Sequence, residues 1–484
     1  MSVTDGLKPE SVFGYFGEIS AIPRGSGNTA EIADYLVNFA RVRGLEHYRD
    51  ARNNVCIIKQ ASAGAESAEP LILQGHTDVV CEKSADCKKD MTREGLDLAV
   101  DGDFIYAEGT TLGGDDGIAV AMMLALLDST ELKHPRLEAV FTSDEEIGML
   151  GAAALDVSPL RGKMLMNIDS EDEGVFTVGC AGGCNALCRI PVTRGKADGK
   201  LFEITVDGLV GGHSGVEINK GRANADKLMG RLLYALSEET EIHLVYVDGG
   251  LKDNAIPCRA AAQIYAADAA AVGGACERLQ AELLNEYRVC DSSVRIRVAA
   301  AENAAFAPMD AESTRRAVAM LVCIPNGVQK MSAEIDGMVE TSLNLGILRT
   351  AENCVEFVSC IRSSVESEKR ALCANVECLA KTLGGTVEIS GDYPAWEYRS
   401  ESPLRDTMKT VFEKQYGYAP RIETIHAGLE CGIFAGKIEG LDCVSFGPQI
   451  DDIHTPREKM SVSSVERVWR MVAAVVEKLA EQNF

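Results

Sequence analysis

The order of apolar and polar residues along the chain predicts strands and helices in alternation. Short apolar runs, typical of strands buried in a sheet, lie at 55–58, 71–73, 139–141 and 164–169. Residues 117–127 form a nearly continuous apolar run, which predicts a helix buried between two layers. This alternation predicts an α/β domain, a mixed sheet flanked by helices on both faces.

Further helices are predicted by their capping residues. Residues 8–21 have a helical pattern, and Asn28 can cap a second helix, with Glu31 completing a pattern like a capping box. Later in the chain, Ser402 can cap a helix over 403–416 whose first residue is proline, where a missing N–H group has no cost.

The pattern changes near residue 183 and changes back near residue 394. With 484 residues the chain is too long for one ordinary domain. From residue 201 onward, strands of alternating polarity are mixed with helices of an α+β type, predicted at 222–237, 274–287 and 365–383. The sequence therefore predicts a discontinuous domain, 1–183 and 394–484, interrupted by an inserted α+β domain, 184–393.

Composition excludes some classes of partner. The chain is 46% hydrophobic and 25% charged, as expected of a globular protein with a large core. Its formal net charge of −25 argues against binding nucleic acid or an anionic membrane. The N-terminus has no secretory pattern, no apolar run is long enough to span a bilayer, and the 16 cysteines follow no regular spacing. We expect a cytoplasmic protein.

Acidic residues and a histidine follow two of the predicted strands. Glu145 and Glu146 come just after the apolar run 139–141, and His76 and Asp78 follow the run 71–73. Ligands of α/β sheets collect at the carboxyl ends of strands, and two adjacent glutamates can divide metal binding and proton transfer between them. Taken alone, each motif fits equally simple readings: a solvated acidic turn, or a surface histidine beside an acid.

Three more polar positions complete a set. Asp115 opens the buried helix after two glycines, Asp169 ends a strand, and His454 lies in a loop near the C-terminus. A dinuclear hydrolytic centre needs about two histidines and three carboxylates, one of them bridging, and a further carboxylate as general base. The five ligands predicted here are His76, Asp115, Glu146, Asp169 and His454, and the predicted base is Glu145.

In the same order, these motifs resemble those of the M20 metallopeptidases. The similarity extends over nearly the whole chain and is greatest to the aminoacyl-histidine dipeptidases, also called Xaa-His or cytosolic nonspecific dipeptidases. The segments that carry it are Ala21–Arg24, Gln74–Val80, Gly113–Gly117, Asp144–Gly148, Asn167–Asp169, Gly211–Gly215, Asn254–Pro257, Arg362–Ser364 and His426–Gly432.

The resemblance implies a zinc-peptidase catalytic domain with two zinc ions per chain, replaceable by cobalt or manganese. One zinc would be held by His76 and Asp169 and the other by Glu146 and His454. Asp115 would bridge the two ions. The peptide bond of unblocked dipeptides, including Xaa-His dipeptides, would be hydrolysed by a water activated between the ions.

The resemblance also implies roles for residues that do not bind metal. Glu145 would act as the base and Asp78 would orient His76. The inserted domain would be a lid, in which His213 polarises the scissile carbonyl while Asn254 and Arg362 hold the substrate. With roughly 200 residues, the insert is long enough for two lid units, so we expect His213 to act in its own chain. The chain could form a homodimer, but a complete site would not require one.

The chain departs from the expected family pattern at one position, and its metal residues are compatible with more than one function. Asp116 stands where the nearest relatives are expected to have asparagine, and it adds negative charge beside Asp115. The bond between these two residues is expected to be cis. Two other functions are compatible with the metal residues: an M20-type deacylase or tripeptidase, and a non-catalytic protein that binds peptides or metal.

Overall fold

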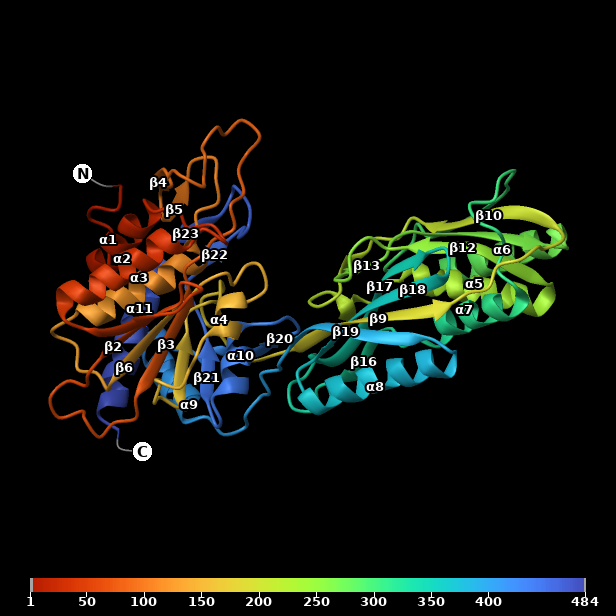
Figure 1. The fold of residues 1–484 in the computed structure, drawn as a ribbon. Helices are drawn as coiled ribbons and strands as arrows, with labels where there is room; N and C mark the ends of the chain where they lie inside the picture. The colour runs from red at the N-terminus through yellow and green to blue at the C-terminus, as the bar shows by residue number, and fades with distance from the viewer. Residues whose placement is uncertain (1–2, 483–484) are drawn as a thin grey trace. The chain divides into compact units, whose positions relative to one another are not determined.

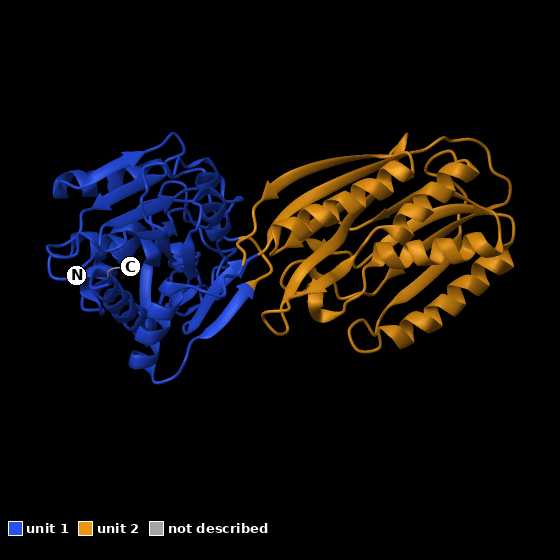
Figure 2. Ribbon diagram, turned by 90° about the horizontal axis from the view of Figure 1, so that it is seen from below, with its two compact units in different colours: residues 1–180, 398–424, 429–484 blue, residues 181–397, 425–428 orange. Residues whose placement is uncertain are grey.

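A computed structural model describes residues 3–482, which fall into two compact units. Unit 1 comprises the chain up to Cys180, Tyr398–Thr424 and the chain from Leu429 onward. Unit 2 comprises Ala181–Glu397 and Ile425–Gly428 (Figure 2). Each unit has its own buried apolar core.

A mixed sheet forms the centre of unit 1, as the apolar runs predicted. Its strand order is β1-β2-β6-β3-β7-β21-β8-β20. The strand β3 runs parallel to β6 and β7, and β7 runs parallel to β21, whereas β2 pairs with β6 in antiparallel fashion. The strands are β1 Glu46–Arg49, β2 Val55–Lys59, β3 Leu71–His76, β6 Leu137–Thr142, β7 Met164–Asn167, β8 Val175–Cys180, β20 Arg421–Ile425 and β21 Asp442–Ser445.

Helices flank this sheet, with α3 packed against β3 and β6 and with α9 and α10 packed against β21 (Figure 1). The predicted buried helix is α3, in which every residue from Gly117 to Leu127 is buried. The helices of unit 1 are α1 Glu10–Ser20, α2 Ala30–Arg43, α3 Gly114–Asp128, α4 Leu150–Ala154, α9 Pro403–Tyr416, α10 Glu430–Lys437 and α11 Val462–Ala480.

One capping prediction is confirmed and another is wrong. The Ser402 hydroxyl accepts the backbone N–H of Arg405 at the start of α9, as predicted. The helix α2, however, begins after Thr29 without a side-chain cap, and the Asn28 amide donates instead to the carbonyl of Thr92. A contact with a distant loop has replaced the local cap.

A small antiparallel sheet in unit 1 has the strand order β22-β23-β5-β4. Its strands β22 and β23 pair Ile450 with Met460 and Asp451 with Lys459, so the residues between them form a hairpin loop. The strands are β4 Leu98–Asp101, β5 Phe104–Ala107, β22 Ile450–Asp451 and β23 Lys459–Ser461.

Unit 2 is built on an antiparallel sheet with helices, as the predicted α+β character requires. Its strand order is β15-β10-β14-β12-β17-β18-β9-β19, with β16 paired to β17. The strands are β9 Gly182–Pro191, β10 Lys200–Asp207, β12 Ile242–Gly249, β14 Ala260–Ala266, β15 Arg295–Ala300, β16 Gly327–Met331, β17 Val339–Thr350, β18 Cys354–Ser363 and β19 Thr386–Tyr393. The short strands β11 Gly212–His213 and β13 Ala255–Ile256 pair separately.

The helices of unit 2 follow the predicted ranges with shifts of a few residues. Helix α7 was not predicted from the sequence pattern. The helices are α5 Ala225–Glu239, α6 Ala269–Glu286, α7 Ala311–Cys323 and α8 Glu366–Thr382.

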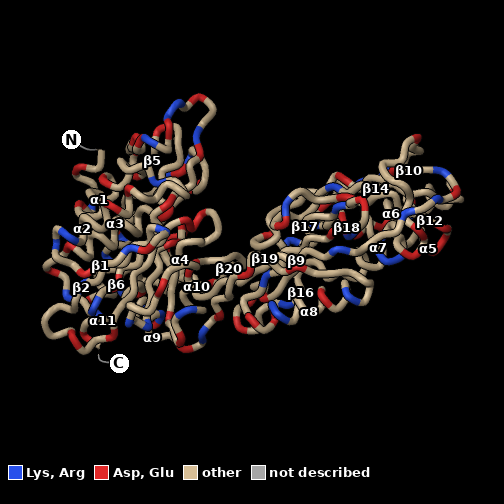
Figure 3. Tube along the Cα trace, in the orientation of Figure 1, with Lys and Arg blue, Asp and Glu red and all other residues tan. Residues whose placement is uncertain are grey.

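Acidic and basic residues are interspersed along the elements of both units (Figure 3). Within residues 3–482, no helix combines the length and apolar character that crossing a membrane requires.

Candidate metal centre

The predicted ligands of unit 1 collect at one edge of the mixed sheet. Because β3, β6 and β7 run parallel, their carboxyl ends meet at the same edge. His76 is the last residue of β3, Glu146 follows β6, and Asp169 follows β7. Asp115 comes from the start of α3 and His454 from the β22–β23 hairpin loop.

Asp115 lies between the two histidines. His76 Nε2 is 3.0 Å from Asp115 Oδ1, and His454 Nε2 is 3.1 Å from Asp115 Oδ2. Each oxygen of one carboxylate thus faces a different imidazole. That is the arrangement required of a carboxylate that bridges two metal ions.

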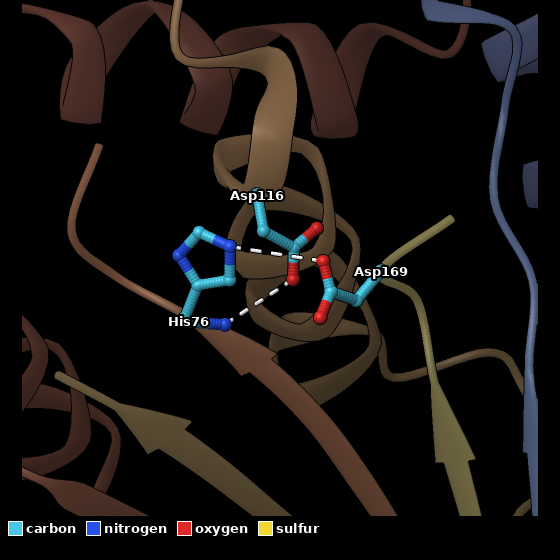
Figure 4. Close-up of side chains that lie close together, drawn as sticks. All are labelled: His76, Asp116 and Asp169. Carbon is cyan, nitrogen blue, oxygen red and sulfur yellow. Dashed lines mark hydrogen bonds and ion pairs between the residues drawn. The ribbon is translucent and has the colours of Figure 1, made fainter. Parts of the chain in front are cut away.

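Each histidine also has a second acidic neighbour. His454 Nε2 lies 3.1 Å from Glu146 Oε2, and His76 Nε2 lies 3.7 Å from Asp169 Oδ1. Figure 4 shows His76 and Asp169 together with Asp116, whose carboxylate accepts the backbone N–H of His76 at 3.2 Å. The five predicted ligands therefore come together as two pairs around Asp115.

Asp78 holds this edge together through two different groups. His76 Nδ1 lies 2.9 Å from the backbone carbonyl of Asp78 and 3.6 Å from its carboxylate, so Nδ1 carries the proton and Nε2 is the nitrogen that can bind metal. The buried carboxylate accepts the N–H groups of Glu145 and Glu146 at 3.0 and 3.3 Å. Asp78 thus orients the histidine mainly through its backbone, and it positions the glutamates through its side chain.

Charge in this cluster shifts the pKa values of the histidines upward. Burial alone would lower the pKa of His76, but hydrogen bonds with Asp115 and Asp78 and the charge of Asp169 hold it well above its usual range. Hydrogen bonds with Asp115 and Glu146 raise the pKa of His454 to about 10. Burial would raise the pKa of Asp115, but the same two histidines lower it below its usual range.

The surroundings of Glu145 raise the pKa of its carboxyl group. Burial, together with the charges of Asp169, Glu430 and Glu146, raises the pKa of Glu145 well above its usual range, although the charge of His76 opposes this shift. A carboxylate with a raised pKa accepts a proton more readily near neutral pH.

The residues present fit a pair of divalent ions. Candidate ligand atoms cluster within 4.8 Å of one another in groups that include Asp115, Glu146 and His454. Glu146 Oε1 is buried and has no hydrogen-bond partner among the described residues, as expected of an atom meant for a cation. Imidazole and carboxylate are ligands that zinc binds well.

Asp116 is buried next to the predicted ligands, and its carboxylate contacts the backbone of His76. The sequence alone did not indicate how its charge affects metal binding. Burial raises the pKa of Asp116 well above its usual range, and the charges of Asp169 and Asp115 add to this. A protonated Asp116 resembles asparagine in both shape and charge. The Asp115–Asp116 peptide bond is cis, as expected.

Sequence reasoning missed Glu458 and Arg24. The Glu458 carboxylate is buried and accepts backbone N–H groups from residues 112–115, and the buried Arg24 guanidinium donates to the carbonyls of Thr77 and Gly113. Arg24 lies in one of the matched motifs. The only signal for Glu458 was its position four residues after His454.

Glu430 was also missed, although its motif was noted. It opens α10, is fully buried, and accepts hydrogen bonds from Gln74 at 2.5 Å and Thr142 at 2.6 Å. Gln74 in turn accepts a hydrogen bond from Asn167 at 2.6 Å. Burial raises the pKa of Glu430 to about 8. This network connects β3, β6 and β7, the strands that lead into the predicted ligands.

The other predicted site residues lie in unit 2. His213 ends β11 and is paired with Ala255 of β13. Its Nδ1 accepts the N–H groups of Gly215 and Val216, both at 3.2 Å, so the proton of the neutral ring is on Nε2. Burial and the charge of Arg362 lower the pKa of His213, which favours this neutral form.

Arg362 and Asn254 differ in their surroundings. Arg362 is nearly buried on β18 and donates to the Tyr393 hydroxyl at 3.0 Å, while its Nε has no partner among the described residues. Asn254 is exposed, and its backbone carbonyl accepts the backbone N–H of Ser214, the residue after His213. His426, which sequence reasoning missed, is buried near this group, and burial with the charges of Arg362 and His213 lowers its pKa to about 4.

Comparison with known proteins matches residues 72–478 to the family described as Peptidase family M20/M25/M40. The chain is 35% identical over 483 residues to the cytosol non-specific dipeptidase of Escherichia coli (strain K12), an alignment that covers 99% of each protein.

Solved structures are similar as well. The structure of aminoacylhistidine dipeptidase from Vibrio alginolyticus matches with a TM-score of 0.92 and 36% identity over 98% of each chain. A tripeptidase from Staphylococcus aureus matches with a TM-score of 0.56 and 16% identity, over 98% of this chain and 100% of the tripeptidase, and this match shows a shared fold only.

Proposed function

The chain belongs to the peptidase family M20/M25/M40, as its motifs predicted, and on that premise we propose that it is a dinuclear zinc dipeptidase that cleaves unblocked dipeptides, including Xaa-His dipeptides. It is a metallopeptidase of this family and therefore a hydrolase. The observation that carries the proposal is Asp115, whose two oxygens each face one histidine. The names of the Escherichia coli and Vibrio alginolyticus relatives support dipeptides as substrates.

The proposed metal ligands divide into two sets that share Asp115. His76 and Asp169 would hold one ion, and Glu146 and His454 the other. When bound, two divalent ions supply Lewis acidity for the peptide carbonyl and lower the pKa of the attacking water. We propose zinc for both positions, with cobalt or manganese as substitutes.

Glu145 would take the proton of the attacking water and deliver it to the leaving amine. The N–H of Glu145 is fixed by Asp78, so its backbone is held while its side chain remains available. Its raised pKa matches both steps, because the same group must first accept a proton and then release it.

Unit 1 would be the catalytic domain and unit 2 the lid. In the lid, the Nε2–H of neutral His213 would donate to the scissile carbonyl oxygen as negative charge develops there. Arg362 would bind the free carboxylate of the dipeptide, because a guanidinium pairs well with that group, and Asn254 would help to hold the substrate. The name of the Escherichia coli relative also supports a cytoplasmic location.

A substrate panel with and without chelator tests the proposal. Purified protein should release amino acids from several dipeptides, Xaa-His types among them, lose this activity in chelator and regain it with Zn²⁺. N-acyl amino acids and tripeptides belong in the same panel. Cleavage of either class with dipeptides untouched would instead identify a deacylase or tripeptidase, and no cleavage at all would favour a binding protein.

A further inference from the structure

Resting on the proposed function, we propose that Glu458 is a positioning residue that, together with Arg24, fixes Asp115 where it can bridge two ions. Neither side chain is among the predicted ligands. Both act on the backbone of the segment that carries Asp115. We call this segment, residues 112–115, the bridge loop.

Glu458 binds every backbone N–H group of the bridge loop. Its Oε2 accepts from Leu112 at 2.9 Å and Gly113 at 3.1 Å, and its Oε1 accepts from Gly114 at 2.8 Å and Asp115 at 3.4 Å. The first N–H groups of a helix have no partners inside the helix, and α3 begins at Gly114 with non-helical backbone angles at Asp115 and Asp116. The carboxylate therefore supplies acceptors that this helix start otherwise lacks.

Arg24 holds the same loop from its carbonyl side. Its Nη2 donates to the carbonyl of Gly113 at 2.8 Å, and its Nη1 donates to the carbonyl of Thr77 at 2.9 Å. Since Thr77 follows His76, one guanidinium connects the bridge loop to the strand end that carries a predicted ligand. The position of Asp115 relative to His76 is thus fixed through a single rigid group.

The packing leaves little room for another arrangement. A Cβ atom at Gly113 would lie 2.6 Å from Val79 Cγ1 and 3.0 Å from Arg24 Nη2, and one at Gly117 would lie 2.3 Å from Arg24 Nη2. Glu458 is 3% exposed and Arg24 is 3% exposed, so water cannot easily replace either partner. These glycines allow the guanidinium to lie directly against the backbone.

The β22–β23 hairpin loop carries residues that act on both proposed metal positions. His454 and Glu458 lie in the same loop between β22 and β23. His454 would bind a single ion, whereas Glu458 controls the carboxylate shared by both. A change at Glu458 should therefore weaken both metal positions together. Metal affinity usually falls about 10–100-fold when a group that supports a ligand is lost.

Metal binding without substrate tests this inference. Metal-stripped protein is titrated with Co²⁺ and followed by visible absorption and metal analysis. For Glu458→Gln, whose amide would turn N–H donors toward N–H groups of the bridge loop, we expect both Co²⁺ dissociation constants to rise about 10–100-fold. The KM for a dipeptide at saturating metal should stay nearly constant while kcat falls.

Two further variants separate positioning from folding. Glu458→Asp keeps two acceptor oxygens and should have intermediate Co²⁺ affinity. Arg24→Lys keeps the charge but cannot reach both carbonyls with a fixed fork, so it should weaken both positions as Glu458→Gln does. It also provides the same test if Glu458→Gln does not fold.

The matched control is Glu138→Gln. Glu138 is another buried carboxylate of unit 1 that accepts backbone N–H groups, from Arg161 at 2.8 Å and Gly162 at 3.0 Å, and it does not contact the bridge loop. We expect this variant to lower the thermal midpoint without changing Co²⁺ affinity. If Glu458→Gln and Arg24→Lys bind Co²⁺ as tightly as wild type, or if only one of the two positions weakens, the inference is overturned. Co²⁺ binding is measured independently of dipeptide cleavage, so failure of the proposed substrate class would leave the result interpretable.

Discussion

Adjacent acids in this chain have different surroundings, and this difference is what separates their roles. Asp115 points one oxygen at each histidine, whereas Asp116 accepts the backbone N–H of His76. Glu146 lies beside His454, whereas burial, together with the charges of nearby acids, raises the pKa of Glu145. Neighbouring side chains diverge, so one short motif can supply both a ligand and a base.

Replacing Glu145 by glutamine tests the proposed base. The substitution keeps shape but removes the group that accepts a proton, so kcat should fall by roughly 10²–10⁴-fold. Both metal ions should remain bound, because Glu145 is not among the proposed ligands. Kinetics combined with metal analysis measures this. Near-normal turnover would show that a different residue accepts the proton.

Replacing Asp116 by asparagine tests whether a negative charge next to Asp115 affects metal binding. Asparagine has nearly the same shape and its side-chain oxygen can still accept the backbone N–H of His76, so we expect it to substitute well, with kcat and Zn²⁺ affinity changed by less than about tenfold. The raised pKa of Asp116, which burial causes, favours the same outcome. Asp116 also clusters with His76 and Asp169 as a possible ligand set. A large loss of Zn²⁺ affinity would therefore show that Asp116 itself binds metal.

At the level of elements, the sequence predicted the parts of the site that local pattern defines. An apolar run followed directly by polar residues predicted β3, β6 and β7 and hence His76, Glu146 and Asp169. The buried helix α3 was predicted from its nearly continuous run of apolar residues. Each of these signals lies within about ten residues of chain, which is the range over which periodicity carries information.

Contacts between distant segments could not be predicted in this way. Glu458 binds N–H groups more than 340 positions earlier in the chain, and Glu430 binds Gln74 across a separation of 356. The wrong cap at Asn28 has the same cause, since a hydrogen bond to Thr92 outweighs the local pattern. These partners are chosen by tertiary packing, and a single sequence does not contain that information explicitly.

The start of α5 contains a buried acid that should make stability depend on pH. Asp226 is fully buried, and neither carboxylate oxygen has a hydrogen-bond partner among the described residues. Burial and the charge of Asp248 raise its pKa well above the usual value of 3.8. Between these two pKa values the folded state binds a proton that the unfolded state has released, so stability falls as pH rises.

Asp226→Asn should therefore be more stable than wild type at pH 8, with little difference at pH 4. Each kcal/mol should raise the thermal midpoint by about 2–4 °C. Thermal unfolding across this pH range measures the gap between the two proteins. Asp268→Asn, at the exposed start of α6, also removes one negative charge and should show no gap that grows with pH. If the difference in thermal midpoint from wild type grows equally with pH for both variants, burial of Asp226 does not explain it.

At the scale of the whole molecule, the sheet of unit 2 consists of two groups of strands. One group is β15-β10-β14-β12 and the other is β17-β18-β9-β19. They join where β12 and β17 pair only at Gly249 and Leu348, whereas pairs within each group extend over many residues. Helices α5 and α6 pack mainly on the first group and α8 packs on the second, whereas α7 contacts β12 of the first group and β9 of the second. This arrangement supports the proposal that the insert is a doubled lid.

A doubled lid leads to a prediction about His213. The motif resemblance implies that in smaller dimeric members of the family the corresponding lid histidine comes from the partner subunit, and a second lid unit could make that contribution unnecessary. His213→Ala and Glu145→Gln should each lose most of the wild-type activity. If His213 acts in its own chain, a mixture of the two proteins contains no complete site, and its activity should stay at the level of the single variants even when subunits exchange.

The mixing experiment needs proof of exchange to be decisive. Exchange can be followed by mass spectrometry of differently labelled chains, and a mixture of wild type with the double variant His213→Ala/Glu145→Gln shows how much activity a mixed assembly retains. If activity returns when the two single variants are mixed, a histidine from one chain must serve the base of another. A donor must come within about 2.7–3.1 Å of the developing oxyanion, so such recovery would require the lid of one chain to close on the other. If the protein is a monomer in solution, the question is already answered, because His213 then has only the site of its own chain to serve.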